Sequence, residues 1–196
     1  MILTVLTAAV VACAGCPERL PNLRATLYYT ALESDYPPGR EAVFRDAKGR
    51  KLARASREFL AAASVEGSAR FGNGLVLNHH VPVDGEMRWI VSDSEAGLDA
   101  RGCPLVPFRT AAVDPEVVPL GTVLDVPATR GMLLPDGTRH DGNWVAGDTG
   151  VSIKGGRIDL YGGDGEASMQ VARDHGIGHL EPLAVEVVGF EEGCGS

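Results

Sequence analysis

Three aspartates are the strongest candidates for chemistry in this sequence. Asp148 and Asp159 lie eleven positions apart, and Asp114 precedes them in the chain. Asp159 lies inside an apolar, strand-forming run that includes Ile158, Leu160 and Tyr161. A carboxylate in such a run either faces outward on an exposed strand or lies in a cleft. In a cleft, partial desolvation raises its pKa and lets it act as an acid near neutral pH.

The surroundings of the other two aspartates also allow a purely structural role. Asp114 stands before Pro115, and Asp148 stands before Thr149 and Gly150, which are common turn sequences. Taken alone, each is therefore better explained as a turn residue. Asp159 has no such explanation, so we rank it first as a catalytic candidate.

Composition and charge limit the classes of function. The chain has 196 residues, 44% hydrophobic and 22% charged, as in an ordinary globular protein. Its formal net charge is -8. Nucleic-acid binding needs clustered lysine and arginine, so we expect no nucleic-acid partner, whereas a neutral or mixed-charge polymer is compatible with this balance.

The first sixteen residues are an apolar run without a charged side chain. The run is too short to span a bilayer but fits the core of a signal peptide, although the usual positively charged start is missing. Ala14-Gly15-Cys16 resembles the end of a bacterial lipoprotein signal, in which the cysteine becomes the lipidated first residue. Val11-Ala12-Cys13 would serve almost as well, and a plain secretory leader or a disordered start is the alternative. We expect export to the bacterial cell envelope, in the periplasm, with lipidation at Cys16.

Two cysteines remain if Cys16 carries the lipid. Cys103 and Cys194 could form one disulfide in an oxidising compartment, and they are too few for a zinc site. If Cys13 is the anchor instead, Cys16 is left over. The five histidines show no metal-binding spacing on a helix, and we expect no cofactor.

Short strand-forming runs separated by tight turns dominate the rest of the chain. Two helices are expected, one over residues 51–63 with its apolar residues on one face, and a shorter one over 166–175. The pattern indicates a compact, mainly β, barrel-like domain. We divide the chain into a leader (1–16), a tether (17–23) and a single domain (24–191), with strands expected over 24–30, 75–78, 89–92, 122–126, 144–146, 158–161 and 183–188.

Five motifs in order, between Phe108 and Tyr161, resemble the 3D (Asp-Asp-Asp) domain. This domain is the catalytic barrel of membrane-bound lytic transglycosylase A and of smaller bacterial cell-wall enzymes. The motifs are Arg109 to Pro115, Val118 to Thr122, Asp148-Thr149-Gly150, Ile153-Lys154-Gly155 and Ile158 to Tyr161. The resemblance extends to Ala25-Thr26-Leu27-Tyr28, Glu66 to Arg70 and Gly102 to Pro107, so it covers most of the chain after the leader. It implies a six-stranded double-psi β-barrel with two or so short helices.

The resemblance also implies an activity and a set of site residues. It implies cleavage of the glycan strands of peptidoglycan between MurNAc and GlcNAc, giving a 1,6-anhydro-muramic product. Asp159 matches the position of the general acid, and Asp148 and Asp114 match the other two signature aspartates. The residues expected to contact substrate are Lys154, Thr149, Gly150, Thr110 and Tyr161. Val151-Ser152 departs from the usual small residues of the family, which puts the shape of this loop in question.

Two other functions stay open at this point. A glycoside hydrolase acting on peptidoglycan or another polysaccharide would need a second carboxylate, and Asp148 and Glu66 are its candidates. A wall-binding module on the same barrel would need no catalytic acid. Retention of all three aspartates favours the enzyme, since a fold alone does not define a function.

Overall fold

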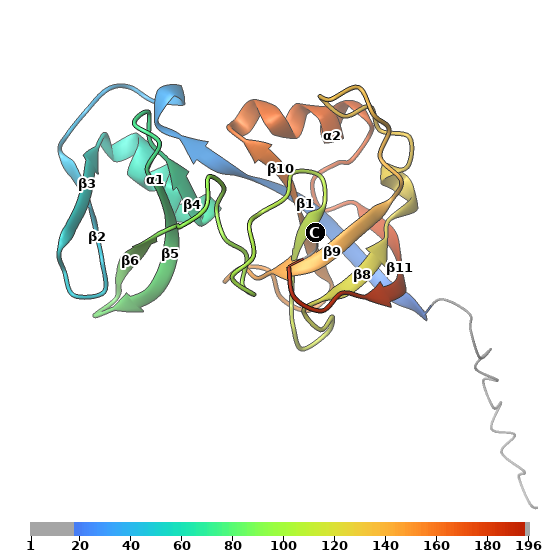
Figure 1. Cartoon of the computed structure of the whole chain (residues 1–196). Helices are drawn as coiled ribbons and strands as arrows, with labels where there is room; N and C mark the ends of the chain where they lie inside the picture. Colours follow the sequence, from blue (N-terminus) through green and yellow to red (C-terminus); the bar gives the residue numbers. More distant parts are fainter. Residues whose placement is uncertain (1–17, 195–196) are drawn as a thin grey trace, which may run out of the picture.

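The computed structural model describes residues 18–194, which form a mainly β protein (Figure 1). The leader and the proposed lipidation site at Cys16 lie outside the described residues. The strands are β1 (Glu18–Leu32), β2 (Ala42–Arg45), β3 (Lys51–Ala55), β4 (Ser68–Arg70), β5 (Val76–Val83), β6 (Glu86–Val91), β7 (Thr110–Val113), β8 (Thr122–Asp125), β9 (Asn143–Asp148), β10 (Arg157–Asp164) and β11 (Pro182–Phe190). The helices are α1 (Arg57–Glu66) and α2 (Gln170–Asp174), with 3-10 turns η1 (Glu33–Asp35), η2 (Pro127–Thr129) and η3 (Glu166–Met169).

Six strands pair in a closed circuit. Neighbouring pairs run in the order β10-β7-β9-β8-β11-β1, and β1 pairs back to β10 in parallel. Apolar side chains from all six strands form one buried cluster, which includes Ala25, Val113, Leu124, Trp144 and Val185. We call these six strands with α2 the ring lobe. Its cluster is the core that fixes the direction in which each strand presents its polar side chains.

A second lobe consists of β2 to β6 and α1, and it lies beside the ring lobe (Figure 1). It has its own apolar cluster, built around Phe44, Phe59, Leu77 and Trp89. Leu27 of β1 packs against both clusters. The described residues therefore contain two main apolar cores.

Strand β1 connects the two lobes. It pairs with β11 and β10 of the ring lobe and, at its C-terminal end, with β4 of the second lobe. It begins at Glu18, so the residues that we assigned to a tether pair with β11 instead. The pattern of strand formers from Arg24 onward identified only the central part of this strand.

The first helix differs from the prediction over 51–63. Residues Lys51–Ala55 form β3, which pairs with β2, and α1 begins only after Ser56. The Ser56 side chain accepts a hydrogen bond from the Phe59 N–H, as an N-cap residue does. The spacing of Leu52 and Ala55 also fits a helix, so the strand pairing overrides the helical pattern there. The second expected helix is confirmed in part, as η3 followed by α2.

A disulfide joins Cys103 to Cys194 across 91 residues, with 5.2 Å between the Cα atoms. It ties the loop before β7 to the end of the chain. No helix within residues 18–194 is both long and apolar enough to cross a membrane.

Replacing both Cys103 and Cys194 by serine should lower the free energy of unfolding by about 2–4 kcal/mol, because a crosslink across a long loop restricts the unfolded chain. Urea unfolding monitored by tryptophan fluorescence measures the loss. Treating the unreplaced protein with a reductant should lower its free energy of unfolding by a similar amount. An unchanged unfolding midpoint in both experiments would contradict this assignment.

Candidate active site

Alternation along β10 places Asp159 outside the ring-lobe core. Ile158 and Leu160 are fully buried in that core, so Asp159 and Tyr161 point to the opposite face of the strand. The parallel register pairs Asp159 with Thr26 and Tyr161 with Tyr28 on β1. Directly paired residues of neighbouring strands present their side chains on the same face, so these four side chains form one polar row.

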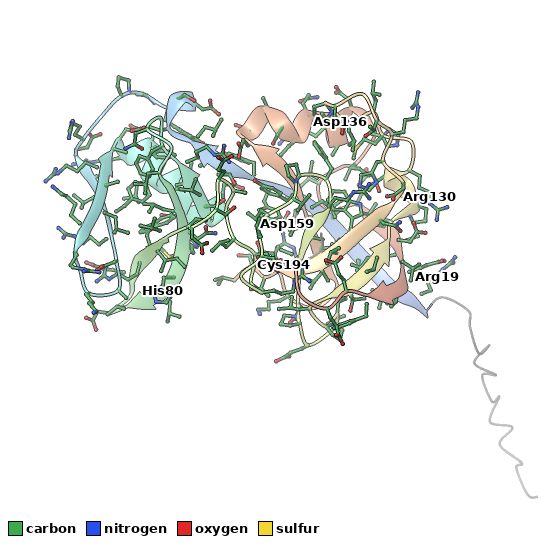
Figure 2. The ribbon with its side chains drawn as sticks, viewed as in Figure 1. Arg19, His80, Arg130, Asp136, Asp159 and Cys194 are labelled. Carbon is green, nitrogen blue, oxygen red and sulfur yellow. A yellow bond between two sulfur atoms is a disulfide. The ribbon has the colours of Figure 1, made fainter. Side chains whose placement is uncertain are left out.

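Asp159 lies in this row, near the centre of the molecule and close to where the two lobes meet (Figure 2). Its Oδ1 atom is buried and has no hydrogen-bond partner among the described residues. Burial is the main cause that raises the pKa of Asp159. The nearby Thr26 hydroxyl and the charges of Arg157 and His179 act to lower this pKa. The Thr26 hydroxyl makes no hydrogen bond of ordinary geometry. The carboxyl group is therefore largely desolvated, which favours its protonated form.

Asp148 ends β9 and is held in place by two donors. Its Oδ1 accepts the Thr149 N–H at 2.8 Å, and its Oδ2 accepts the Tyr28 hydroxyl at 3.0 Å. Burial raises the pKa of Asp148 to about 6, while both hydrogen bonds act to lower it. Burial is likewise the main cause of the raised pKa of Asp159.

Tyr28 contacts both Tyr161 and Asp148. Its ring lies 5.1 Å from that of Tyr161, and its hydroxyl donates to Asp148. Burial first, then the charges of Asp148 and Asp159, raise the pKa of Tyr28 well above its usual value. The phenol therefore stays protonated and remains a donor throughout the physiological pH range.

Asp114 is placed as a loop brace. Its Oδ2 accepts the Gly155 N–H at 2.7 Å, and its Oδ1 accepts the Glu116 N–H at 3.2 Å. The bond from Gly155 is the main cause that lowers the pKa of Asp114. The bond from Gly155 holds the turn that carries Lys154, whose charge also lowers the pKa of Asp114.

The residues expected to contact substrate fall into two groups. Lys154 and Thr149 are exposed, and Gly150 packs so closely on Ile153 that an added Cβ would lie 2.7 Å from it. Thr110 and Tyr161 are instead buried and bonded internally. The Thr110 hydroxyl accepts the Val106 N–H, and the Tyr161 hydroxyl bonds that of Thr30 at 2.7 Å. Their side chains support the site from behind.

A cavity lies beside the end of α2. Its volume is about 330 Å³, and its lining residues are Leu27, Arg173, Gly176, Ile177, Gly178 and His179. His179 lies near enough for its charge to lower the pKa of Asp159. Sequence reasoning did not connect Thr26, Thr30 or His179 with the site. Pairing of β1 with β10 brings in the two threonines, and His179 comes from the loop between α2 and β11. Within residues 18–194, no group of three or more acidic, histidine or cysteine side chains is arranged to hold a metal ion.

The sequence profile described as 3D domain matches residues 109–176, which include all three aspartates. Residues 109–176 are a 3D domain. No curated protein matches the chain.

Solved structures extend the likeness beyond the 3D domain. The structure of Escherichia coli MltA with bound chitohexaose is 18% identical, with a TM-score of 0.58, over 87% of this chain and 72% of that one. The membrane-bound lytic murein transglycosylase of Agrobacterium tumefaciens is 16% identical, with a TM-score of 0.59, over 87% of this chain and 75% of that one. The lytic transglycosylase LtgG of Burkholderia pseudomallei is 18% identical, with a TM-score of 0.51, over 88% of this chain and 76% of that one. The chain shares the fold of MltA, including much of what lies outside the 3D domain.

Asp148→Asn should change how stability depends on pH. Because the pKa of Asp148 is raised in the folded state to about 6, the folded protein binds this proton more tightly than the unfolded chain. The contribution of this proton to the stability of the folded state is complete below about pH 4 and is lost as the pH rises through about 6. Between about pH 4 and pH 7 the free energy of unfolding should fall by up to roughly 3 kcal/mol more in the unreplaced protein than in the variant.

Urea unfolding at several pH values measures this difference, with Asp93→Asn as an exposed control. Parallel curves for the unreplaced protein and Asp148→Asn would show that Asp148 does not bind its proton more tightly in the folded state.

Proposed function

We propose that this protein is a lytic transglycosylase that cleaves the MurNAc-GlcNAc β-1,4 bond of peptidoglycan. The observation that carries the proposal is the buried carboxyl of Asp159, on the β10 strand of a 3D domain, with one oxygen unpartnered and its pKa raised. A carboxyl group with a raised pKa holds its proton to a higher pH, which suits delivery of that proton to a glycosidic oxygen. This makes the protein a carbon-oxygen lyase acting on a polysaccharide.

The reaction needs one acid and no external nucleophile. Asp159 gives its proton to the leaving oxygen while the bond from that oxygen to C1 of the muramic sugar breaks. The C6 hydroxyl of the same sugar then forms a bond to C1, and its proton passes to the Asp159 carboxylate. The enzyme is regenerated, and no water or cofactor is consumed, since the substrate supplies its own hydroxyl.

The other site residues have supporting roles in this proposal. Asp148 accepts a hydrogen bond from the Tyr28 hydroxyl and fixes its position. Asp114 binds the backbone of the Gly155 turn and so presents Lys154 to polar groups of the glycan. Thr149 and Gly150 border the glycan through their backbone. Tyr161 and Thr110 support the surrounding structure, because their own hydroxyls form internal hydrogen bonds.

We further propose that the six strands of the ring lobe form a double-psi β-barrel. The closed circuit of pairings supports this, as do the two parallel pairs, β1 with β10 and β7 with β9. A closed sheet removes free strand edges and gives a rigid frame on which site residues keep their spacing.

Peptidoglycan as partner places the protein in the bacterial cell envelope. The MltA structure with bound chitohexaose supports a β-1,4-linked amino-sugar glycan as ligand, because that relative shares the fold. Lipidation of Cys16 and a periplasmic location complete the proposal, on the basis of the leader sequence.

Asp159→Asn should abolish release of 1,6-anhydro-muropeptides from purified sacculi. An amide at this position cannot donate the proton, so the rate should fall by roughly 100-fold or more. Mass spectrometry of the soluble products measures the rate. Asp136→Asn, which changes an exposed turn residue of the ring lobe, is the matched control and should leave the rate unchanged.

No anhydro product from the unreplaced protein, or equal amounts from it and Asp159→Asn, would refute the proposal. Products with reducing ends would indicate a hydrolase instead.

A further inference from the structure

The hairpin of β2 and β3 concentrates positive charge in an acidic protein. Residues 40–57 carry seven basic and two acidic side chains, whereas the whole chain has a net charge of -8. All seven basic residues are exposed. The two strands form a separate sheet at the edge of the second lobe that lies away from the ring lobe (Figure 1). We call residues 40–57 the basic hairpin.

The strand register places three of these cations on one face. Phe44 and Ala55 are buried in the apolar cluster of the second lobe, so the positions that alternate with them face outward. Arg45 pairs directly with Lys51, and Arg54 lies two pairs away on the same face. The outward face of the basic hairpin is therefore a row of three exposed cations.

This row lowers the stability of the sheet, because like charges directly opposite each other on paired strands repel. The guanidinium groups of Arg45 and Arg54 donate to backbone carbonyls at 2.9 Å, which leaves their charges uncompensated. Of the seven cations, only Arg50 forms an ion pair within residues 18–194. A local arrangement that costs stability without a compensating contact is typical of a functional surface.

The acidic side chains close to the row are engaged elsewhere. Asp46 pairs with Arg50 at 2.6 Å. Glu41 accepts two backbone N–H groups, at 2.8 and 3.2 Å. Glu86 of β6 pairs with Arg88 at 2.7 Å. The outward row is thus available to an anionic ligand from outside the chain.

A cavity of about 260 Å³ lies at the tip of the basic hairpin. The turn supplies Lys48 and Arg50 to its lining, and Leu52, Trp89 and Ile90 form an apolar wall. Arg50 is already paired, whereas Lys48 is exposed and has no ion-pair partner in the described part of the chain. The cavity suits a ligand that combines a carboxylate with a short aliphatic segment.

We propose that the basic hairpin binds the acidic peptide stems of peptidoglycan, through its outward row of cations and the cavity at its tip. Peptide stems carry free carboxylates and short aliphatic side chains, which complement the charge of the row and the wall of the cavity. The identity of this partner rests on the proposed function. The ring lobe then acts on the glycan while the second lobe holds the peptides attached to it.

The position of the basic hairpin favours the wall over a membrane surface as its partner. Strand β1 begins at Glu18, at the end of the molecule opposite the basic hairpin (Figure 1). Lipidation at Cys16, as proposed, would hold that opposite end at the membrane. The basic hairpin would then point away from the lipid headgroups.

The triple variant Arg45→Gln/Lys51→Gln/Arg54→Gln tests this inference by sedimentation with purified sacculi. All proteins in the assay also carry Asp159→Asn, so that the sacculi are not cleaved during the measurement. At about 50 mM salt the dissociation constant of the triple variant should rise by roughly tenfold, because three exposed ion pairs with stem carboxylates are lost. Its midpoint of urea unfolding should be unchanged or higher, since the opposed charges are gone.

The matched control is Arg19→Gln/Arg24→Gln/Arg139→Gln. It removes the same number of exposed cations from the ring lobe and gives the same net charge. Its dissociation constant for sacculi should change by less than about twofold, because an exposed charge outside the binding surface contributes little.

Two further arms identify the ligand. Sacculi whose peptide stems have been removed by an amidase should bind the triple variant and its parent equally. Vesicles that contain phosphatidylglycerol should bind neither protein. Raising the salt to about 500 mM should remove the difference on intact sacculi, because salt screens exposed charges.

Equal binding of the triple variant and its parent to intact sacculi would overturn the inference. A difference that persists on stripped glycan would also overturn it, and vesicle binding that is lost in the triple variant would assign the basic hairpin to a membrane surface. If the protein with Asp159 intact releases no anhydro product, the proposed function fails, while these binding measurements still decide whether the basic hairpin binds peptide stems.

Discussion

The parallel pairing of β1 with β10 is the interaction on which the site depends. It closes the circuit of six strands and sets Thr26 opposite Asp159 and Tyr28 opposite Tyr161. A shift by one residue would turn Asp159 into the apolar core and bring Ile158 out. Ile158 and Leu160 are fully buried, so their burial holds the register that keeps the acid outside the core.

Burial has the same effect on three acids of the chain. Asp159, Asp148 and Glu66 all have raised pKa values, and in each case burial is the main cause. Asp114 differs, because two backbone N–H groups bind its carboxylate and lower its pKa. The signature aspartates thus divide into a desolvated pair, Asp159 and Asp148, and a brace, Asp114. Only the desolvated pair holds its protons to a higher pH than an ordinary aspartate does.

Sequence reasoning anticipated the mainly β class and the 3D domain, because both depend on local patterns. The apolar residues around Asp159 indicated its strand, and the turn sequence at Asp114 indicated its bracing. The boundary between β3 and α1 was wrong because Leu52 and Ala55 fit both a helix and a strand. The second core and the row of Thr26, Tyr28 and Asp159 could not be predicted, since they depend on which distant strands pair. The internal bonds of Thr110 and Tyr161 likewise follow from packing that spacing does not encode.

The central claim is that Asp159 drives cleavage in which the sugar's own hydroxyl, and not water, attacks the anomeric carbon. Digestion of sacculi in water enriched in heavy oxygen tests it most directly. The account predicts 1,6-anhydro-muropeptides without incorporated heavy oxygen, and none of these products from Asp159→Asn. Heavy oxygen at the anomeric carbon of the released sugars, dependent on Asp159, would contradict it.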